Sequence, residues 1–205
     1  MKKSSLFYLF TAALAMGFYQ TPVQAISIGF QPITQTIATG NSFSVDVVIS
    51  GLTSASEIVS AFDLDITYDP GILATTGIIF SKLLGDPTMY EADNGSVITA
   101  GRIDFWGLSF LSDADLLFVQ TDSFSLATLT FQALGVGATD LLFDSLTFPG
   151  IDVKGLLANP LALDVSTGNV TVTDPSIPST PVPEPSTVWM CLLGFGVIAR
   201  RMSQA

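Results

Sequence analysis

The sequence predicts an all-β domain built as a two-sheet sandwich or jelly roll. Between residues 26 and 174, short runs rich in Val, Ile, Phe, Leu and Thr are broken about every ten residues by Gly, Pro, Asn or Asp. Several runs alternate apolar and polar residues, which is typical of strands with one buried face. No window shows the apolar spacing of an amphipathic helix. A chain of this size accommodates about seven to nine such strands.

Two runs show the alternation most clearly, and each ends at a turn. Residues 43–50 place Phe43, Val45, Val47 and Ile49 on one face, and residues 61–68 do the same with Phe62, Leu64, Ile66 and Tyr68. The second run faces outward with Asp63, Asp65 and Thr67. Further strands are expected at 96–105, 125–134, 139–148 and 161–173, with Ala127, Leu129, Phe131 and Ala133 pointing inward from 125–134.

The N-terminus has the three parts of a secretory signal peptide. Lys2 and Lys3 are followed by an apolar stretch at 6–18 and by the tripeptide Val-Gln-Ala that ends at Ala25. We therefore expect a signal helix and cleavage between Ala25 and Ile26, which makes the protein an exported one. An uncleaved anchor helix is the alternative.

The C-terminus contains an extended linker and a hydrophobic plug. Residues 171–187 are mostly Pro, Ser, Thr and Asp, which disfavours both helix and central strand. Residues 188–199 are uncharged and end at Arg200 and Arg201. A short hydrophobic helix over 186–199 spans about 21 Å, less than the bilayer core of about 30 Å, and the two arginines act as a membrane stop with a cytoplasmic C-terminus.

The order of these C-terminal parts resembles the PEP-CTERM sorting signal of Gram-negative bacteria. The matching residues are Pro183, Glu184 and Pro185, then the apolar run, then the arginines. The resemblance implies processing near Pro-Glu-Pro by an exosortase, a membrane-embedded transpeptidase-like enzyme, in species that make exopolysaccharide. It implies a cell-surface or secreted protein that is only transiently anchored in the inner membrane. A permanent C-terminal anchor is the alternative.

Three blocks in the middle of the chain resemble a cohesin domain. They are GNSFSVDVVISGL at 40–52, SAFDLDITYDPGIL at 60–73 and LATLTFQAL at 126–134, and the strongest part is the strand that ends in Tyr-Asp-Pro. The resemblance implies a jelly-roll sandwich of nine strands, related to cellulose-binding modules, that recognises dockerin modules. This chain has no dockerin-like calcium loop, so the implied partner is another protein. The expected organisation is a signal peptide at 1–25, a cohesin-like sandwich at 26–173, a linker at 174–182 and a sorting segment at 183–205.

Composition excludes many active sites and one class of partner. The chain has no histidine and one cysteine, which removes His-dependent nucleophile systems, His-ligated zinc, CxxC sites and intrachain disulfides. The formal net charge is −11, and the only cations between residues 26 and 182 are Lys82, Arg102 and Lys154. We therefore expect no binding to nucleic acid.

Carboxylates are the remaining chemical groups of interest. Asp63 and Asp65 share a strand face, with Cβ atoms roughly 6 to 7 Å apart, and could contribute to a calcium site with Asp69, 91–95 or 113–115. An acidic, solvated face is the alternative, and no other cofactor is indicated. A glycosidase pair is not expected, because Asp104 is most simply a structural partner of Arg102.

Aromatic residues offer one candidate ligand platform. Phe105, Trp106, Phe110 and Phe118 could stack on a sugar ring, although core packing explains most aromatics in a sandwich. Trp106 is the candidate for exposure because Gly107 follows it at an expected strand end.

The sequence therefore predicts an exported, non-catalytic binding protein of the cell surface or extracellular matrix. The expected ligand is a protein module or a polysaccharide. The alternative function is that of a structural envelope or biofilm component with calcium-dependent self-association.

Overall fold

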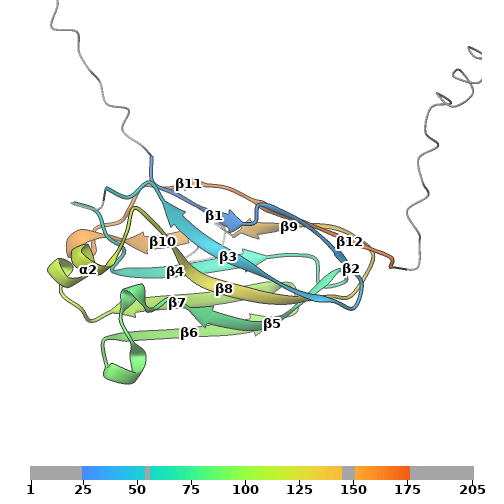
Figure 1. Cartoon of the computed structure of the whole chain (residues 1–205), viewed down its shortest axis with the longest axis horizontal. Helices are drawn as coiled ribbons and strands as arrows, with labels where there is room; N and C mark the ends of the chain where they lie inside the picture. Colours follow the sequence, from blue (N-terminus) through green and yellow to red (C-terminus); the bar gives the residue numbers. More distant parts are fainter. Residues whose placement is uncertain (1–24, 54–55, 145–150, 176–205) are drawn as a thin grey trace, which may run out of the picture.

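Two β-sheets pack face to face in an elongated sandwich (Figure 1). The computed structural model describes residues 25–53, 56–144 and 151–175. The predicted mainly-β, two-sheet architecture is confirmed. The expected signal helix and C-terminal hydrophobic helix lie outside the described residues, and within them no helix is both long and apolar enough to cross a bilayer.

One sheet has five strands in the order β11-β1-β3-β8-β5. Their bounds are Asp164–Val165 for β11, Ser27–Gln31 for β1, Ser42–Ser50 for β3, Ser123–Ala133 for β8 and Leu73–Phe80 for β5. Neighbouring strands are antiparallel except β1 and β11.

The other sheet has seven strands, with the order β2-β12-β9-β4-β7-β6 and with β10 also paired to β4. Their bounds are Thr34–Ala38 for β2, Gly168–Thr173 for β12, Gly137–Phe143 for β9, Ala61–Thr67 for β4, Arg102–Ser109 for β7, Ala92–Thr99 for β6 and Ile151–Lys154 for β10. Only β2 and β12 run parallel within this described sheet.

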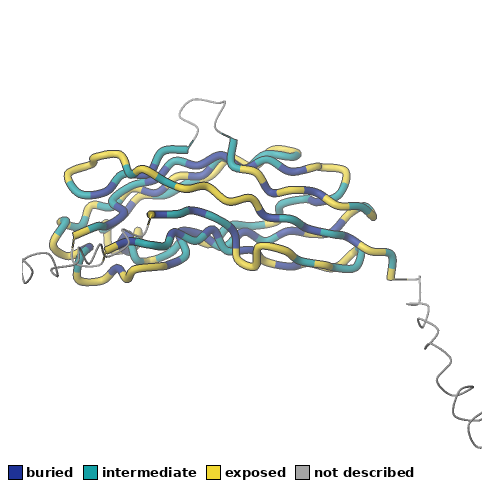
Figure 2. The backbone as a smooth tube through the Cα atoms, turned by 90° about the horizontal axis from the view of Figure 1, so that it is seen from above, coloured by how far each residue is buried: buried dark blue, intermediate teal, exposed yellow. Residues whose placement is uncertain are grey.

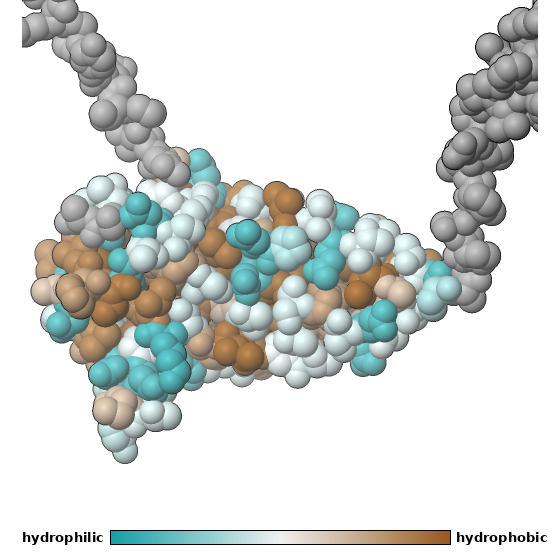
Figure 3. All heavy atoms as spheres, in the orientation of Figure 1, coloured by the Kyte–Doolittle hydropathy of each residue, from teal (hydrophilic) through white to brown (hydrophobic). Residues whose placement is uncertain are grey.

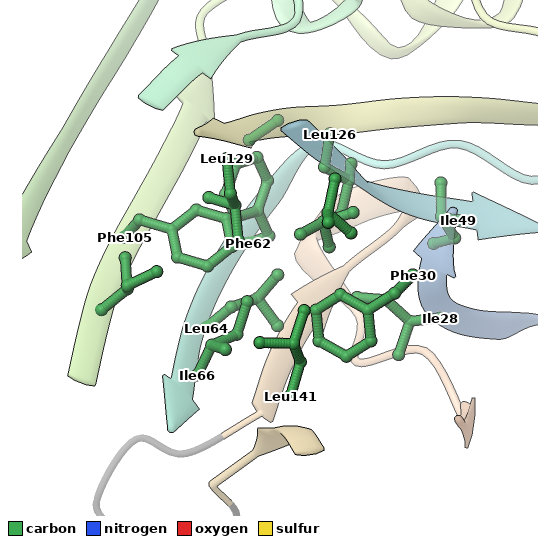
Figure 4. Close-up of a cluster of buried hydrophobic side chains, with 14 of the residues drawn as sticks. Ile28, Phe30, Ile49, Phe62, Leu64, Ile66, Phe105, Leu126, Leu129 and Leu141 are labelled. Carbon is green, nitrogen blue, oxygen red and sulfur yellow. The ribbon is translucent and has the colours of Figure 1, made fainter. Parts of the chain in front are cut away.

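The core lies between the sheets and is formed by every second residue of their strands (Figure 2). The side chains predicted to point inward from 43–50, 61–68 and 125–134 are all buried. Figure 4 shows Ile28 and Phe30 of β1 facing Leu141 of β9, and Phe62 of β4 beside Phe105 of β7. The alternation in the sequence therefore predicted the core correctly in these strands.

Two other expectations about strands were wrong. Residues 96–105 are not one strand but parts of β6 and β7, which form a hairpin that turns at Ala100 and Gly101. Gly101 has φ +80°, a conformation that favours glycine, and this allows the tight turn. Residues 161–173 contain β11 and β12 with a break at Ser166 and Thr167.

A short helix, α2 (Asp113–Val119), was not predicted. Ser112 caps it, because its Oγ accepts a hydrogen bond from the backbone N–H of Asp115 at 3.2 Å and donates one to the Asp115 carboxylate at 2.6 Å. The spacing Ser-x-x-Asp was the available signal. Leu116 is the helix's one buried residue, so no apolar period could reveal it.

The helical segments gather at one end of the sandwich. α2, η2 (Lys82–Leu84), η3 (Pro87–Met89) and η4 (Leu156–Ala158) follow strands that finish at that end. β12 finishes at the opposite end, where the described part of the chain also stops (Figure 1).

Gln120 fixes α2 to the sandwich. Its side-chain Oε1 accepts from the N–H of Val59 at 2.8 Å, and its Nε2 donates to the carbonyls of Val59 at 2.8 Å and Leu83 at 3.1 Å. The side chain is buried, so a nonpolar replacement leaves three backbone groups without partners.

Replacing Gln120 with alanine should therefore lower the free energy of unfolding by about 2–4 kcal/mol. Urea denaturation of the purified protein measures this loss. Gln132→Ala is the control, because Gln132 is exposed on β8 and its loss should change stability by less than about 0.5 kcal/mol. Equal effects of the two substitutions would contradict the role of Gln120.

Candidate functional site

The outer surface of β4, β7 and β10 is a continuous acidic face. Its carboxylates are Asp63 and Asp65 of β4, Asp104 of β7 and Asp152 of β10. Register places Asp63 opposite Asp152 and Asp65 opposite Asp104. Like charges directly opposite one another destabilise a sheet, so this arrangement requires compensation.

Arg102 compensates the inner part of the acidic face. Its Nε lies 3.1 Å from Asp65 Oδ1, and a terminal nitrogen lies 2.8 Å from Oδ2, which makes a two-point contact. A second terminal nitrogen lies 3.8 Å from Asp144. The hydrogen bond to Asp65 raises the pKa of Arg102 above its usual value. The predicted pairing of Arg102 with Asp104 is therefore wrong, because Asp65 receives the two-point contact instead.

Asp65 is buried although its strand position faces outward. It is 2% exposed, whereas the sequence predicted a solvated side chain. The Arg102 guanidinium lies across it from β7, and a buried carboxylate is tolerated only when it is paired in this way.

Asp63 carries the uncompensated charge of the acidic face. Its side chain makes no hydrogen bond or ion pair within the described residues, while the neighbouring Asp152 is paired with Lys154 at 2.8 Å. Burial raises the pKa of Asp63, and the negative charges of Asp104, Asp65 and Asp152 raise it further.

The described residues do not assemble a metal-binding group from these acids. No cluster of three or more His, Cys, Asp or Glu side chains is placed to hold a metal ion there. Two of the carboxylates considered as further ligands already accept hydrogen bonds: Asp69 from the N–H of Gly71 at 2.8 Å, and Asp113 from that of Leu157 at 3.1 Å. Asp63 and Asp65 thus lie on one face without the additional ligands that calcium needs.

Trp106 lies on the same outer face, beside Asp63 in the register of β4 and β7. It is 38% exposed and lies within β7, not at the strand end expected for it. Its ring covers Gly95 of β6, where an added Cβ would approach Trp106 Cζ2 to 2.3 Å. A glycine at 95 therefore permits the indole to lie against the sheet.

The other three aromatic candidates do not join Trp106. Phe105 is fully buried in the core, whereas Phe110 and Phe118 are exposed near α2. Of the four aromatic residues considered as a ligand platform, only Trp106 therefore lies exposed on the acidic face.

The N-terminal processing residues fall at the start of the described chain. Ala25 is exposed, and Ile26 is the first core residue, with a carbonyl that accepts from the N–H of Asp164 at 2.9 Å. Pro183, Glu184, Pro185, Arg200 and Arg201 lie outside the described residues.

Because the pKa of Asp63 is raised in the folded protein, its ionisation destabilises the fold. Stability should fall as the pH rises through the interval between the ordinary and the raised pKa. We expect Asp63→Asn to raise Tm at neutral pH, with the difference vanishing at a pH below the ordinary carboxyl range. Thermal denaturation at several pH values tests this, with Asp93→Asn as an exposed control on β6. A Tm gain that persists unchanged in acid would contradict the assignment.

Comparison with known proteins adds a family match for the tail and a fold match for the sandwich. Residues 181–203 match the family described as the PEP-CTERM protein-sorting motif. This motif implies an exported protein that is sorted to the cell surface. A search of curated proteins finds no match.

Several solved cohesin structures share the fold. The seventh ScaB type I cohesin from Pseudobacteroides cellulosolvens is 16% identical with a TM-score of 0.57, covering 76% of this chain and 96% of that one. A chain of a type I cohesin–dockerin complex from Clostridium thermocellum is 12% identical with a TM-score of 0.57, and the match covers 73% of this chain and 94% of that one. A non-cellulosomal cohesin from Archaeoglobus fulgidus is 14% identical with a TM-score of 0.53, and the match covers 73% of this chain and 92% of that one. The described part of the chain therefore has a cohesin-like β-sandwich fold, and the chain carries a PEP-CTERM sorting motif at its C-terminus.

Proposed function

We propose that this protein is an exported, non-catalytic binding module whose acidic face recognises a protein module or a polysaccharide. The cohesin-like fold supports a binding role, and one of the similar structures is a complex of a cohesin with a dockerin. A dockerin-like module is therefore the first partner to test. The non-cellulosomal archaeal cohesin supports a search beyond cellulose-degrading assemblies.

The observation that carries this proposal is the exposed indole of Trp106 on an acidic sheet surface. Val97 of β6 and Leu108 of β7 are 55% and 44% exposed and extend the apolar area. Large aromatic side chains with exposed neighbours are common at binding hot spots, and a flat indole also stacks on sugar rings. The surrounding carboxylates favour a partner with basic residues or a hydroxyl-rich glycan.

A non-catalytic role agrees with the geometry of the acids. A glycosidase needs one carboxyl that protonates the leaving group and a second that attacks or activates water. Both oxygens of Asp65 are occupied by Arg102. Asp65 is therefore not free to act with Asp63 as such a pair.

The alternative function is a structural envelope or biofilm component with calcium-dependent self-association. The unpaired Asp63 beside Asp104 favours it, because calcium held between two copies would relieve repulsion on both faces. Self-association on addition of calcium, without affinity for dockerins or glycans, distinguishes this alternative.

Two processing steps complete the proposal. The signal peptide is removed between Ala25 and Ile26, which is supported by the burial of Ile26 as the first core residue. An exosortase then acts near Pro183, Glu184 and Pro185, after the apolar segment and its arginines have anchored the chain transiently in the inner membrane. The product is a surface or secreted protein.

Replacing Trp106 with alanine should weaken the binding of a dockerin module or a soluble polysaccharide by at least about tenfold. Isothermal titration with each probe measures this change, and an unchanged Tm shows that the fold is kept. Tyr90→Ala is the matched control, because Tyr90 is an exposed aromatic at the end of η3, outside β4, β7 and β10. Equal affinity of the Trp106 variant and the wild type would exclude the indole as the contact.

Replacing residues 183–185 by three alanines should leave the C-terminal segment attached. Intact-mass analysis of the protein from its native host should show loss of both ends in the wild type and retention of 186–205 in the variant, which stays in the membrane fraction. Pro178→Ala in the linker is the control. A wild-type mass that includes the tail would contradict the sorting proposal and indicate a permanent anchor.

A further inference from the structure

A second exposed surface lies at the α2 end of the sandwich, beyond the ends of β7 and β10. It contains Phe110, Phe118 and Leu157, which are 60%, 90% and 83% exposed. Figure 3 shows apolar side chains gathered at this end of the molecule. We call these three residues the apolar end. Large apolar side chains exposed together on a soluble domain usually mark an interaction site.

The three residues lie on separate segments at this end of the sandwich. Phe110 follows β7, and Phe118 lies on α2, on the side opposite the buried Leu116. Leu157 belongs to η4, and its backbone N–H donates to the carboxylate of Asp113 at 3.1 Å, so η4 is held against the start of α2.

The backbone of η4 is strained where it displays Leu157. Leu157 has φ 55° and ψ 28°, and Ala158 has φ 58°. These left-handed conformations favour glycine or asparagine, and each bulky residue there has an energetic cost. The Leu157 side chain is exposed, so core packing gives no return for this strain. Strain that packing does not explain is typical of functional positions.

The border of the apolar end is acidic. Asp115 on α2 and Asp122 after it are both exposed. The cations on the adjoining segments are already paired: Lys82 of η2 with Asp86 at 2.7 Å, and Lys154 at the end of β10 with Asp152 at 2.8 Å. Two copies meeting through this end would bring their acidic borders together, which disfavours a self-association contact. A basic partner would instead gain from the same border.

We propose that the apolar end is a docking site for a segment of another protein that carries apolar anchor residues flanked by lysine or arginine. Phe118 and Leu157 supply the apolar contact, and Asp115 and Asp122 supply the charge complement. The site uses other residues than the acidic face around Trp106, so Phe118→Ser and Trp106→Ala test this proposal and the proposed function separately.

The probe is a synthetic amphipathic helix of leucine and lysine, compared with a matched helix of leucine and glutamate. Fluorescence anisotropy with the purified protein should show saturable binding of the basic helix alone. Leu157→Asn and Phe118→Ser should each weaken that binding by about tenfold. The Tm of Leu157→Asn should stay the same or rise, because asparagine tolerates the left-handed conformation better than leucine. If Leu157 served only stability, its replacement would lower Tm and would not weaken binding of the helix while Tm is kept.

Val136→Ser is the matched control, because Val136 is 63% exposed in the turn before β9, away from α2. Loss of basic-helix binding in Trp106→Ala but not in Phe118→Ser overturns the proposal in favour of the acidic face. Equal binding of the basic and acidic helices overturns the proposal, and so does equal binding of the basic helix by the wild type and by Leu157→Asn and Phe118→Ser. Binding to phosphatidylcholine vesicles that is lost in Phe118→Ser, without binding of either peptide, overturns the proposal in favour of a lipid surface. Dimerisation that is seen by sedimentation analysis and lost in Phe118→Ser overturns the proposal in favour of a second copy of this chain.

Discussion

Contact between the two sheets through Phe131 is the interaction on which the arrangement of the other surfaces depends. Phe131 of β8 stacks on Phe43 of β3, with ring centroids 5.5 Å apart, and meets the edge of Tyr68 from the end of β4 at 5.4 Å. The Tyr68 hydroxyl accepts hydrogen bonds from the N–H and Oγ1 of Thr75 in β5, so its polar group is also satisfied. Because side chains alternate along a strand, this inward packing also fixes which residues face solvent.

The charges of the acidic face are a consequence of that alternation. Asp63 and Asp65 must share one surface once Phe62 and Leu64 are buried, and the register then sets them opposite Asp152 and Asp104. The chain offers only three cations in its described part, and each forms an ion pair there. Two of them, Arg102 and Lys154, lie on this face. Their positions offset repulsion around Asp65 and Asp152 and leave Asp63 as the unsatisfied charge.

The sequence predicted those features that depend on local alternation. Phe43, Val45, Leu64 and Leu129 could be assigned to the core because each lies in a clear period of two. The burial of Asp65 could not be predicted, because Arg102 reaches its carboxylate from β7 and the backbone N–H of Asp144, just after β9, donates to its carbonyl at 2.8 Å. The apolar end could not be predicted either, because the hydrogen bond from Leu157 to Asp113 that holds η4 against α2 joins residues 44 positions apart in the sequence.

Each of the two surfaces proposed for binding contains a residue in an environment that is unfavourable for the stability of the fold. On the acidic face, burial and the neighbouring carboxylates raise the pKa of Asp63 and so disfavour its charged form, and η4 holds Leu157 in a conformation that disfavours its side chain. The core shows the opposite behaviour, with aromatic and aliphatic residues in regular alternation. Local conflicts of this kind persist where another constraint offsets their cost. The described chain stops at the far end of β12, opposite α2 (Figure 1). A module tethered through its C-terminus would therefore hold the apolar end at its far tip, with the acidic face exposed along its side.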